Sequence, residues 1–142
     1  MRTGQFRFDI DMLSQRLIDA TIWLRKNPAT RDSAFGYFGA STGAAAALIA
    51  AAKLPAEIKT VVSRGGRPDL AVDYLQKVKA PTLLIVGGND TVVLDLNKKA
   101  MQSLSAAKKL EIVPGASHLF EERGKLEEVA RLSVDWFLVH LR

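Results

Sequence analysis

The segment Gly39-Ala40-Ser41-Thr42-Gly43 places a serine between two glycines with the spacing G-x-S-x-G. It follows a short apolar, aromatic run at residues 34–38 and precedes an alanine-rich stretch at 42–53, so it joins a predicted strand to a predicted helix. At such a sharp turn, bulk at either glycine position would clash with the sheet or the helix, and the serine hydroxyl points away from the sheet. The pattern therefore predicts that Ser41 is a nucleophile. The alternative is a glycine-rich turn in which Ser41 only caps the helix.

Two further residues suited to this chemistry follow later predicted strands. Asp90 comes after the apolar run 82–86, and His118 comes in the loop after the run 110–113. Taken alone, Asp90 is a common helix cap and His118 a common surface residue. Together with Ser41 they occur in the order Ser, Asp, His, each after a different strand, which is the order of one class of catalytic triad. In that arrangement His118 deprotonates Ser41, and Asp90 fixes the tautomer of the imidazole and stabilises its cation.

The elements that must position these residues alternate along the chain. Apolar spacing and breaker residues predict helices at 10–25, 42–53, 68–77, 93–104 and 126–141, and strands at 34–38, 58–62, 82–86 and 110–113. Asp9 or Asp11 is the expected cap of the first helix. Strands separated by helices lie parallel, so we expect an α/β fold with a mainly parallel sheet of about four strands and helices on both faces. The strands' carboxyl ends then gather the three candidates at one edge.

Composition narrows the class of protein. The 142 residues fit a single domain, 1–142, and the absence of cysteine excludes a disulfide scaffold, a thiolate metal site and a cysteine nucleophile. The net charge is +5, but the basic residues are scattered among acidic ones, so no nucleic-acid partner is expected. No apolar run is long enough to cross a bilayer, and no signal peptide is visible, so no membrane partner and a cytoplasmic location are expected. We expect no cofactor and no metal.

Four segments carry a resemblance to a known family: GYFGASTGAAAAL, VVSRGGRPDLA, PTLLIVGGNDTVV and IVPGASHLFEE. They are similar to α/β-hydrolases of the dienelactone-hydrolase type, and most similar to the small hydrolase domains sometimes fused to phosphoribosyltransferases. The resemblance covers nearly the whole chain. It implies that Ser41 is the nucleophile, Asp90 the acid, His118 the base and the Thr42 N–H one donor to the oxyanion.

The chain departs from this family at its N-terminal side. The family's sheet has about eight strands, and the four predicted here correspond to the last four. The second oxyanion donor of the family comes from a loop after one of the missing strands, and residues 1–8 contain no HGGG-like segment. Losing one such donor costs roughly 10²–10³-fold in kcat, so the resemblance implies weak catalysis.

The missing strands would leave the apolar strand 34–38 at the edge of the sheet. Exposed apolar edges promote association, and natural proteins cover them. We therefore expect a homodimer or higher homo-oligomer through this edge, with the partner chain as a source of the absent oxyanion donor or of a substrate wall. In the alternative, residues 1–8 fold back over the edge.

Two arginines, Arg64 and Arg67, follow the second predicted strand beside two glycines. A guanidinium pairs with a carboxylate through two hydrogen bonds, so these residues are candidates for binding an anionic group of a substrate. The alternative is a structural pair with Asp69 or a solvated loop.

The leading hypothesis is a serine hydrolase that acts on small carboxylic esters or lactones through an acyl-enzyme. The substrate is expected to be small because no lid insertion is visible. The alternative is a non-catalytic, hydrolase-like module for oligomerisation or interaction. A nucleotide-binding domain is disfavoured, because neither G-x-G-x-x-G nor G-x-x-x-x-G-K-[ST] occurs.

Overall fold

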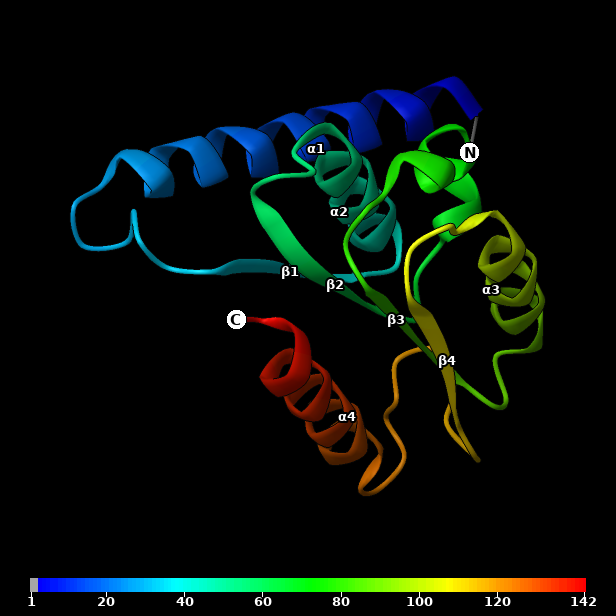
Figure 1. The fold of residues 1–142 in the computed structure, drawn as a ribbon. Helices are drawn as coiled ribbons and strands as arrows, with labels where there is room; N and C mark the ends of the chain where they lie inside the picture. The colour runs from blue at the N-terminus through cyan, green and yellow to red at the C-terminus, as the bar shows by residue number, and fades with distance from the viewer. Residues whose placement is uncertain (1–2) are drawn as a thin grey trace.

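The structure is a computed structural model that describes residues 3–142, with side chains from Asp9 onward. The elements follow one another as predicted, and Figure 1 shows their arrangement. The helices are α1 (Thr3–Lys26), α2 (Thr42–Lys53), the 3-10 helix η1 (Pro68–Lys77), α3 (Thr91–Ser103) and α4 (Lys125–His140). The strands are β1 (Phe35–Ala40), β2 (Ile58–Arg64), β3 (Thr82–Gly87) and β4 (Lys108–Val113).

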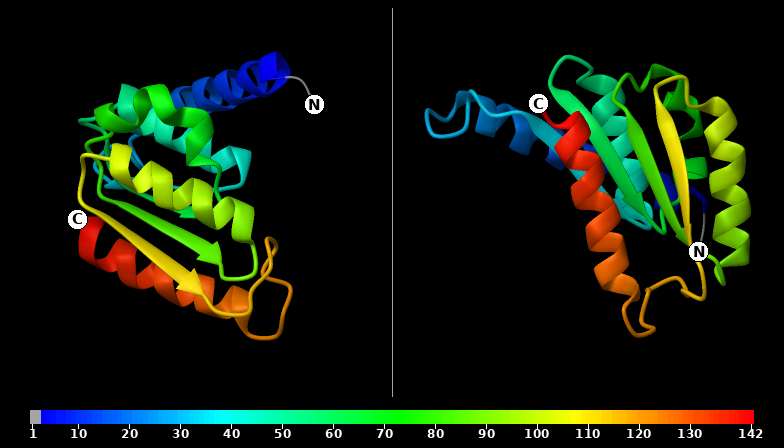
Figure 2. Two further views of the ribbon diagram at one scale, coloured as in Figure 1. Left: turned by 90° about the vertical axis from the view of Figure 1, so that its right-hand side faces the viewer. Right: turned by 60° about the horizontal axis from the view of Figure 1, so that its bottom comes forward.

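The four strands form one parallel sheet in the order β1-β2-β3-β4, which confirms the predicted α/β fold. Helices α1, α2 and α3 lie on one face and α4 lies on the other (Figures 1 and 2). Successive strand residues point to opposite faces, so Val61 and Leu84 join the core under α2, whereas Val62 and Leu83 join the core under α4. All strands run the same way, so their carboxyl ends meet at one edge of the sheet.

The first helix is longer than predicted. It begins at Thr3, so the expectation that Asp9 or Asp11 caps it is wrong, because both lie inside the helix. No proline interrupts the chain before Pro28, so the helix continues beyond the start of its apolar stripe. The alternative in which residues 1–8 cover the sheet edge falls partly outside the described residues. Residues 1 and 2 and the side chains of 3–8 are not described, and the backbone of 3–8 continues α1.

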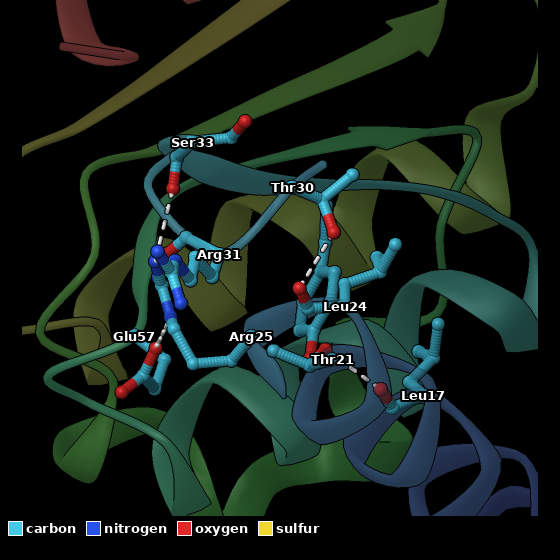
Figure 3. A network of polar contacts seen from close by, with 9 residues as sticks. Leu17, Thr21, Leu24, Arg25, Thr30, Arg31, Ser33 and Glu57 are labelled. Carbon is cyan, nitrogen blue, oxygen red and sulfur yellow. Dashed lines mark hydrogen bonds and ion pairs between the residues drawn. The ribbon is translucent and has the colours of Figure 1, made fainter. Parts of the chain in front are cut away.

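A polar network holds the connection from α1 into β1 (Figure 3). Arg25 pairs with Glu57 at 2.7 Å and also donates hydrogen bonds to the carbonyl oxygens of Arg31 and Ser33. Deeper in the helix, the hydroxyls of Thr21 and Tyr37 share a buried hydrogen bond of 2.7 Å, and burial raises the pKa of Tyr37. These contacts fix the entry of the edge strand β1.

The fold predicts a clear difference between buried and exposed aliphatic side chains. Leu84 is fully buried at the centre of the sheet, whereas Val92 is 72% exposed on α3. We expect Leu84→Ala to lower the free energy of unfolding by about 3 kcal/mol, because it leaves a cavity, and Val92→Ala to change it by less than about 0.5 kcal/mol. Urea denaturation followed by circular dichroism measures both. Equal losses in the two variants would contradict the assigned core.

Candidate active site

Ser41 occupies a strained turn between β1 and α2. Its backbone has φ 53° and ψ −124°, a region that costs a non-glycine residue about 1–3 kcal/mol. The strain is held by two hydrogen bonds: the Ser41 N–H donates to the Arg64 carbonyl at 3.3 Å, and the Ser41 carbonyl accepts from the Arg67 N–H at 3.1 Å. The Ser41 side chain makes no capping hydrogen bond to α2, so the structure does not show the alternative in which it only caps the helix.

Asp90 and His118, which are 28 positions apart, are in direct contact. The Asp90 Oδ2 lies 2.7 Å from the His118 Nδ1. The Asp90 side chain is 15% exposed and that of His118 is 41% exposed, so the pair is shielded on the carboxylate side and open on the imidazole side. Asp90 makes no side-chain cap to α3, although it precedes that helix. With Nδ1–H donating to the carboxylate, the other ring nitrogen, Nε2, keeps a lone pair that can accept a proton.

Backbone contacts hold the loops of Asp90 and His118 together. The Gly88 N–H donates to the Val113 carbonyl at 2.8 Å, and the Asn89 N–H donates to the Ala116 carbonyl at 3.0 Å. A Cβ at Gly87 would lie 2.3 Å from the Ala116 carbonyl oxygen, so only glycine permits this approach. The two loops are thereby fixed relative to each other by main-chain geometry as well as by the side-chain pair.

The loop of residues 64–67 connects Ser41 to His118. Arg64 and Arg67 hold the backbone of Ser41, as described above, while Gly65 abuts the imidazole: a Cβ built on Gly65 would lie 3.4 Å from the His118 Nδ1. Gly65 has φ 53° and donates its N–H to the Ile85 carbonyl at 2.7 Å. The predicted nucleophile and base therefore lie against the same short loop.

The contact between Ser41 and His118 is not made in this structure. Within the described part of the chain, Ser41 Oγ has no hydrogen bond, so the Asp–His half of the predicted triad is assembled and the Ser–His bond is absent. Catalytic hydrogen bonds are often long or misaligned before a substrate binds.

A backbone donor adjoins the Ser41 hydroxyl. Thr42 is the first residue of α2, so its N–H has no acceptor within the helix. Among the described residues its N–H also makes no backbone hydrogen bond outside the helix. The positive end of the helix dipole adds to the field at this position. The N–H is therefore available to a developing oxyanion.

The two candidate arginines have different surroundings. Arg67 forms a two-pronged pair with Asp69, at 3.0 Å from Nε and 2.9 Å from a terminal nitrogen, and this carboxylate raises the pKa of Arg67. Arg64 has no such partner. Its Nε is buried without a hydrogen bond in the described residues, and its guanidinium carbon lies 5.7 Å from the centre of the Phe120 ring.

Arg64 also borders a cavity beneath α4. The cavity has a volume of about 490 Å³ and includes Phe38 and Phe137 in its wall. Phe38 is three positions before Ser41 in the chain, and the Arg64 carbonyl holds the Ser41 N–H. An arginine that pairs with no carboxylate among the described residues thus borders a mainly apolar cavity close to the turn.

Sequence reasoning missed Asn97, a fully buried residue of α3. Its Nδ2 donates to the Gly66 carbonyl at 3.0 Å and to the Val93 carbonyl at 2.8 Å, while its Oδ1 has no partner among the described residues. Asn97 thereby clamps the loop that touches both Ser41 and His118. The available signal was its position: it falls four residues after Val93 and three before Ala100, on the apolar side of α3.

In the described residues, no group of three metal-binding side chains occurs, and no helix is long and apolar enough to span a membrane.

Comparison with known proteins gives consistent matches. The model of the dienelactone hydrolase family matches residues 6–136. The crystal structure of dienelactone hydrolase from Anabaena variabilis is 56% identical with a TM-score of 0.94, over 99% of this chain and 65% of that one. The crystal structure of a predicted CIB-like hydrolase from Thermoplasma acidophilum is 25% identical with a TM-score of 0.65, over 83% of this chain and 57% of that one.

A curated protein from two strains of Mycobacterium tuberculosis is also similar. It bears the provisional name phosphoribosyl transferase and is 59% identical over 134 residues, which are 94% of this chain and 30% of that protein. The chain therefore spans less than a third of this relative and about two thirds of the Anabaena enzyme. The name agrees with the resemblance, drawn from the sequence, to hydrolase domains that are fused to phosphoribosyltransferases.

The two glycines of the turn differ in the space around them, which corrects the expectation that both exclude a side chain. A Cβ at Gly39 would lie 2.6 Å from the Gly43 carbonyl oxygen, whereas a Cβ at Gly43 meets no described atom within 4 Å. Gly43 borders the groove beside the open edge of β1, which explains its free space.

We expect Gly39→Ala to destabilise the fold by about 2 kcal/mol or more, and Gly43→Ala to be nearly neutral. Thermal melts of the two variants check this, and similar melting temperatures would contradict the described turn.

Proposed function

The chain belongs to the dienelactone hydrolase family, and we propose that it is a serine hydrolase that cleaves small carboxylic esters or lactones. The observation that supports this proposal most is the hydrogen bond between Asp90 and His118, together with the strained turn of Ser41 that the loop of residues 64–67 connects to His118. Around it are a free helix N-terminal donor, at Thr42, and a loop that touches both the nucleophile's backbone and the base. These are the parts that acyl transfer needs: a nucleophile, an oriented base and an oxyanion donor.

The acylation step uses the described geometry. The Ser41 Oγ forms a bond to the carbonyl carbon of the ester while its proton passes to the His118 Nε2, and the negative charge develops on the carbonyl oxygen beside the Thr42 N–H. Asp90 stabilises the resulting imidazolium through the 2.7 Å bond to Nδ1. The C–O bond to the leaving alcohol then breaks, and His118 returns the proton to that oxygen. In a lactone the leaving alcohol remains attached to the acyl group.

Deacylation repeats these roles with water as the nucleophile. His118 takes a proton from the water as it attacks the acyl carbon, and then returns a proton to the Ser41 Oγ as that bond breaks. The Thr42 N–H holds the oxyanion in both halves. We assign the Thr42 N–H as one such donor among the described residues, because it has no backbone acceptor there.

We further propose that Arg64 favours substrates with an anionic group. Its guanidinium has a buried Nε without a partner, and the cavity that it borders is otherwise mainly apolar. A carboxylate on an apolar acyl chain matches both properties. The structural pair with Asp69 makes Arg67 a weaker candidate for this role.

Labelling with a fluorophosphonate tests the nucleophile. We expect the wild type to react covalently and to turn over a short-chain ester, and Ser41→Ala to lose the label and at least about a thousandfold of the activity. Ser105→Ala is the matched control, because Ser105 is an exposed serine far along the chain, bonded to the Gln76 carbonyl. Labelling that persists in Ser41→Ala would exclude the proposed mechanism. A folded wild type that never reacts would instead favour the non-catalytic interaction module.

The role of Arg64 is tested with two esters that differ only in a terminal carboxylate on the acyl chain. We expect Arg64→Ala to raise KM for the anionic ester about tenfold, because a charge-assisted hydrogen bond is lost, and to leave KM for the neutral ester unchanged. Arg131→Ala serves as the control, since Arg131 is an exposed arginine on α4. An equal rise for both esters would remove the assignment.

A further inference from the structure

Phe120 lies in the loop between β4 and α4 (orange in Figure 2), and its backbone is left-handed, with φ 56°. Among the described residues, Ser41 is the one other non-glycine residue with a positive φ. A bulky side chain rarely takes this conformation, because its Cβ comes close to the neighbouring backbone. Such residues persist where surrounding contacts hold them, and they gather at active sites. The conformation of Phe120 therefore requires a physical cause.

The burial of the Phe120 ring supplies that cause. Phe120 is 1% exposed, whereas its neighbours Leu119 and Glu121 are exposed. The Arg64 guanidinium carbon lies 5.7 Å from the ring centre, within the range of a cation–π contact. One buried side chain between two exposed ones attaches the loop to the core. The ring belongs to the apolar cluster beneath α4, whose other buried members are Val62, Leu83, Ile85, Val113, Ala116 and Val129.

Two hydrogen bonds restrain the interval between Phe120 and His118. The Phe120 N–H donates to the Ser117 carbonyl at 3.1 Å, which closes a turn with His118 and Leu119 at its centre. The Ser117 N–H donates to the Glu122 Oε1 at 3.0 Å. The segment is thus bonded to itself around His118, so a displacement of the ring is passed on to the His118 backbone.

The placement of the His118 backbone decides where Nε2 points. The bond from Nδ1 to Asp90 holds one atom of the imidazole, and a single hydrogen bond leaves the ring free to turn about it. The side chain is 41% exposed, so packing around the ring adds little restraint. A Cβ at Gly65 would lie 3.3 Å from the His118 carbonyl oxygen, so this backbone contacts the loop after β2 and is also tied to Phe120.

Filling the core would not by itself require a strained backbone. The other members of the cluster are similarly buried, and none of them has a positive φ. At Phe120 the left-handed backbone lets the ring enter the core while the imidazole two positions earlier reaches Asp90. The strain therefore belongs to the arrangement of the loop around His118 and not to packing alone.

From these contacts we propose that Phe120 is the positioning residue of His118. Its buried ring and left-handed backbone hold the imidazole against Asp90, with Nε2 left for the proton of Ser41. Phe120 touches no reacting atom in this role and acts through His118. The effect on turnover rests on the proposed serine-hydrolase function, whereas the placement of the imidazole does not and is measured separately.

Nuclear magnetic resonance tests the placement. Long-range proton–nitrogen correlation spectra show which ring nitrogen of a neutral histidine carries the proton. His140→Gln assigns the signals, since the chain has two histidines. We expect Nδ1–H in the wild type, because Asp90 accepts this proton. In Phe120→Leu, and more so in Phe120→Val, we expect a shift toward Nε2–H, the form that a free side chain prefers.

The rate at which a fluorophosphonate labels Ser41 measures the consequence. We expect it to fall about tenfold in Phe120→Leu and about a hundredfold in Phe120→Val, because a small misplacement of a catalytic group is costly. With a neutral short-chain ester, kcat should fall in the same order while KM stays within about twofold. The ester is neutral because the ring also contacts Arg64. Phe120→Leu keeps most of the buried volume, so the comparison remains if Phe120→Val does not fold.

Leu83→Ala is the matched control. Leu83 belongs to the same cluster and is 2% exposed, but it lies near the start of β3, at the end of the strand away from Asp90. It loses a similar amount of buried side chain, so we expect a melting temperature lowered as in Phe120→Val, with the His118 proton on Nδ1 and the labelling rate unchanged.

Three results would overturn the role of Phe120: wild-type spectra and labelling in both Phe120 variants, equal losses in Leu83→Ala, or a wild type whose neutral His118 carries its proton on Nε2. A wild type with the proton on Nδ1 that no fluorophosphonate labels would instead refute the proposed function. In that case the spectra of the two variants still decide whether Phe120 places His118.

Discussion

The turn at Ser41 is the constraint on which the rest of the site depends. A serine held at φ 53° and ψ −124° is strained, and the chain keeps it there through hydrogen bonds from both sides of Ser41 to the loop of residues 64–67. Glycine at position 39 lets the start of α2 come close to β1, since a Cβ there would meet the Gly43 carbonyl at 2.6 Å. Among the described residues, the same turn leaves the Ser41 hydroxyl without a capping hydrogen bond and the Thr42 N–H without a backbone acceptor. The proposed nucleophile and the proposed oxyanion donor thus come from one local geometry.

The proposed base, His118, is placed in a different way, by the meeting of distant loops at the carboxyl ends of parallel strands. Asp90 follows β3 and His118 follows β4, and neighbouring strands in the sheet bring them to 2.7 Å. The loop after β2 contacts both this pair and the backbone of Ser41. The Asn97 side chain holds this loop by donating a hydrogen bond to the Gly66 carbonyl. The interior of the site is therefore tightly bonded, whereas β1 at its outer side pairs with β2 only, among the described residues.

The sequence predicted the fold and the loops because the signals for both are local. Short apolar runs, which alternate along the chain with helical segments, identified all four strands, and the G-x-S-x-G spacing located the turn. The start of α1 was mispredicted because aspartate is a common N-cap residue, and Asp9 and Asp11 lie just before and within the start of the apolar stripe. The stripe does not extend back to Thr3, where the helix begins. The space beside Gly43 and the clamp by Asn97 were missed because both depend on tertiary neighbours. Likewise, no pattern distinguished Arg64 from Arg67; the fold pairs Arg67 with Asp69 and places Arg64 at the border of a cavity.

In the proposed mechanism, Ser41 and His118 act on one reacting carbon, with the Thr42 N–H as oxyanion donor. The most direct measurement is a crystal structure of the protein after reaction with a fluorophosphonate. We expect a phosphorus atom bonded to the Ser41 Oγ, a phosphoryl oxygen about 3 Å from the Thr42 nitrogen, and the His118 Nε2 facing the adduct while Nδ1 keeps its bond to Asp90. An adduct on another side chain, or a Ser41 adduct from which the imidazole is turned away, would contradict it.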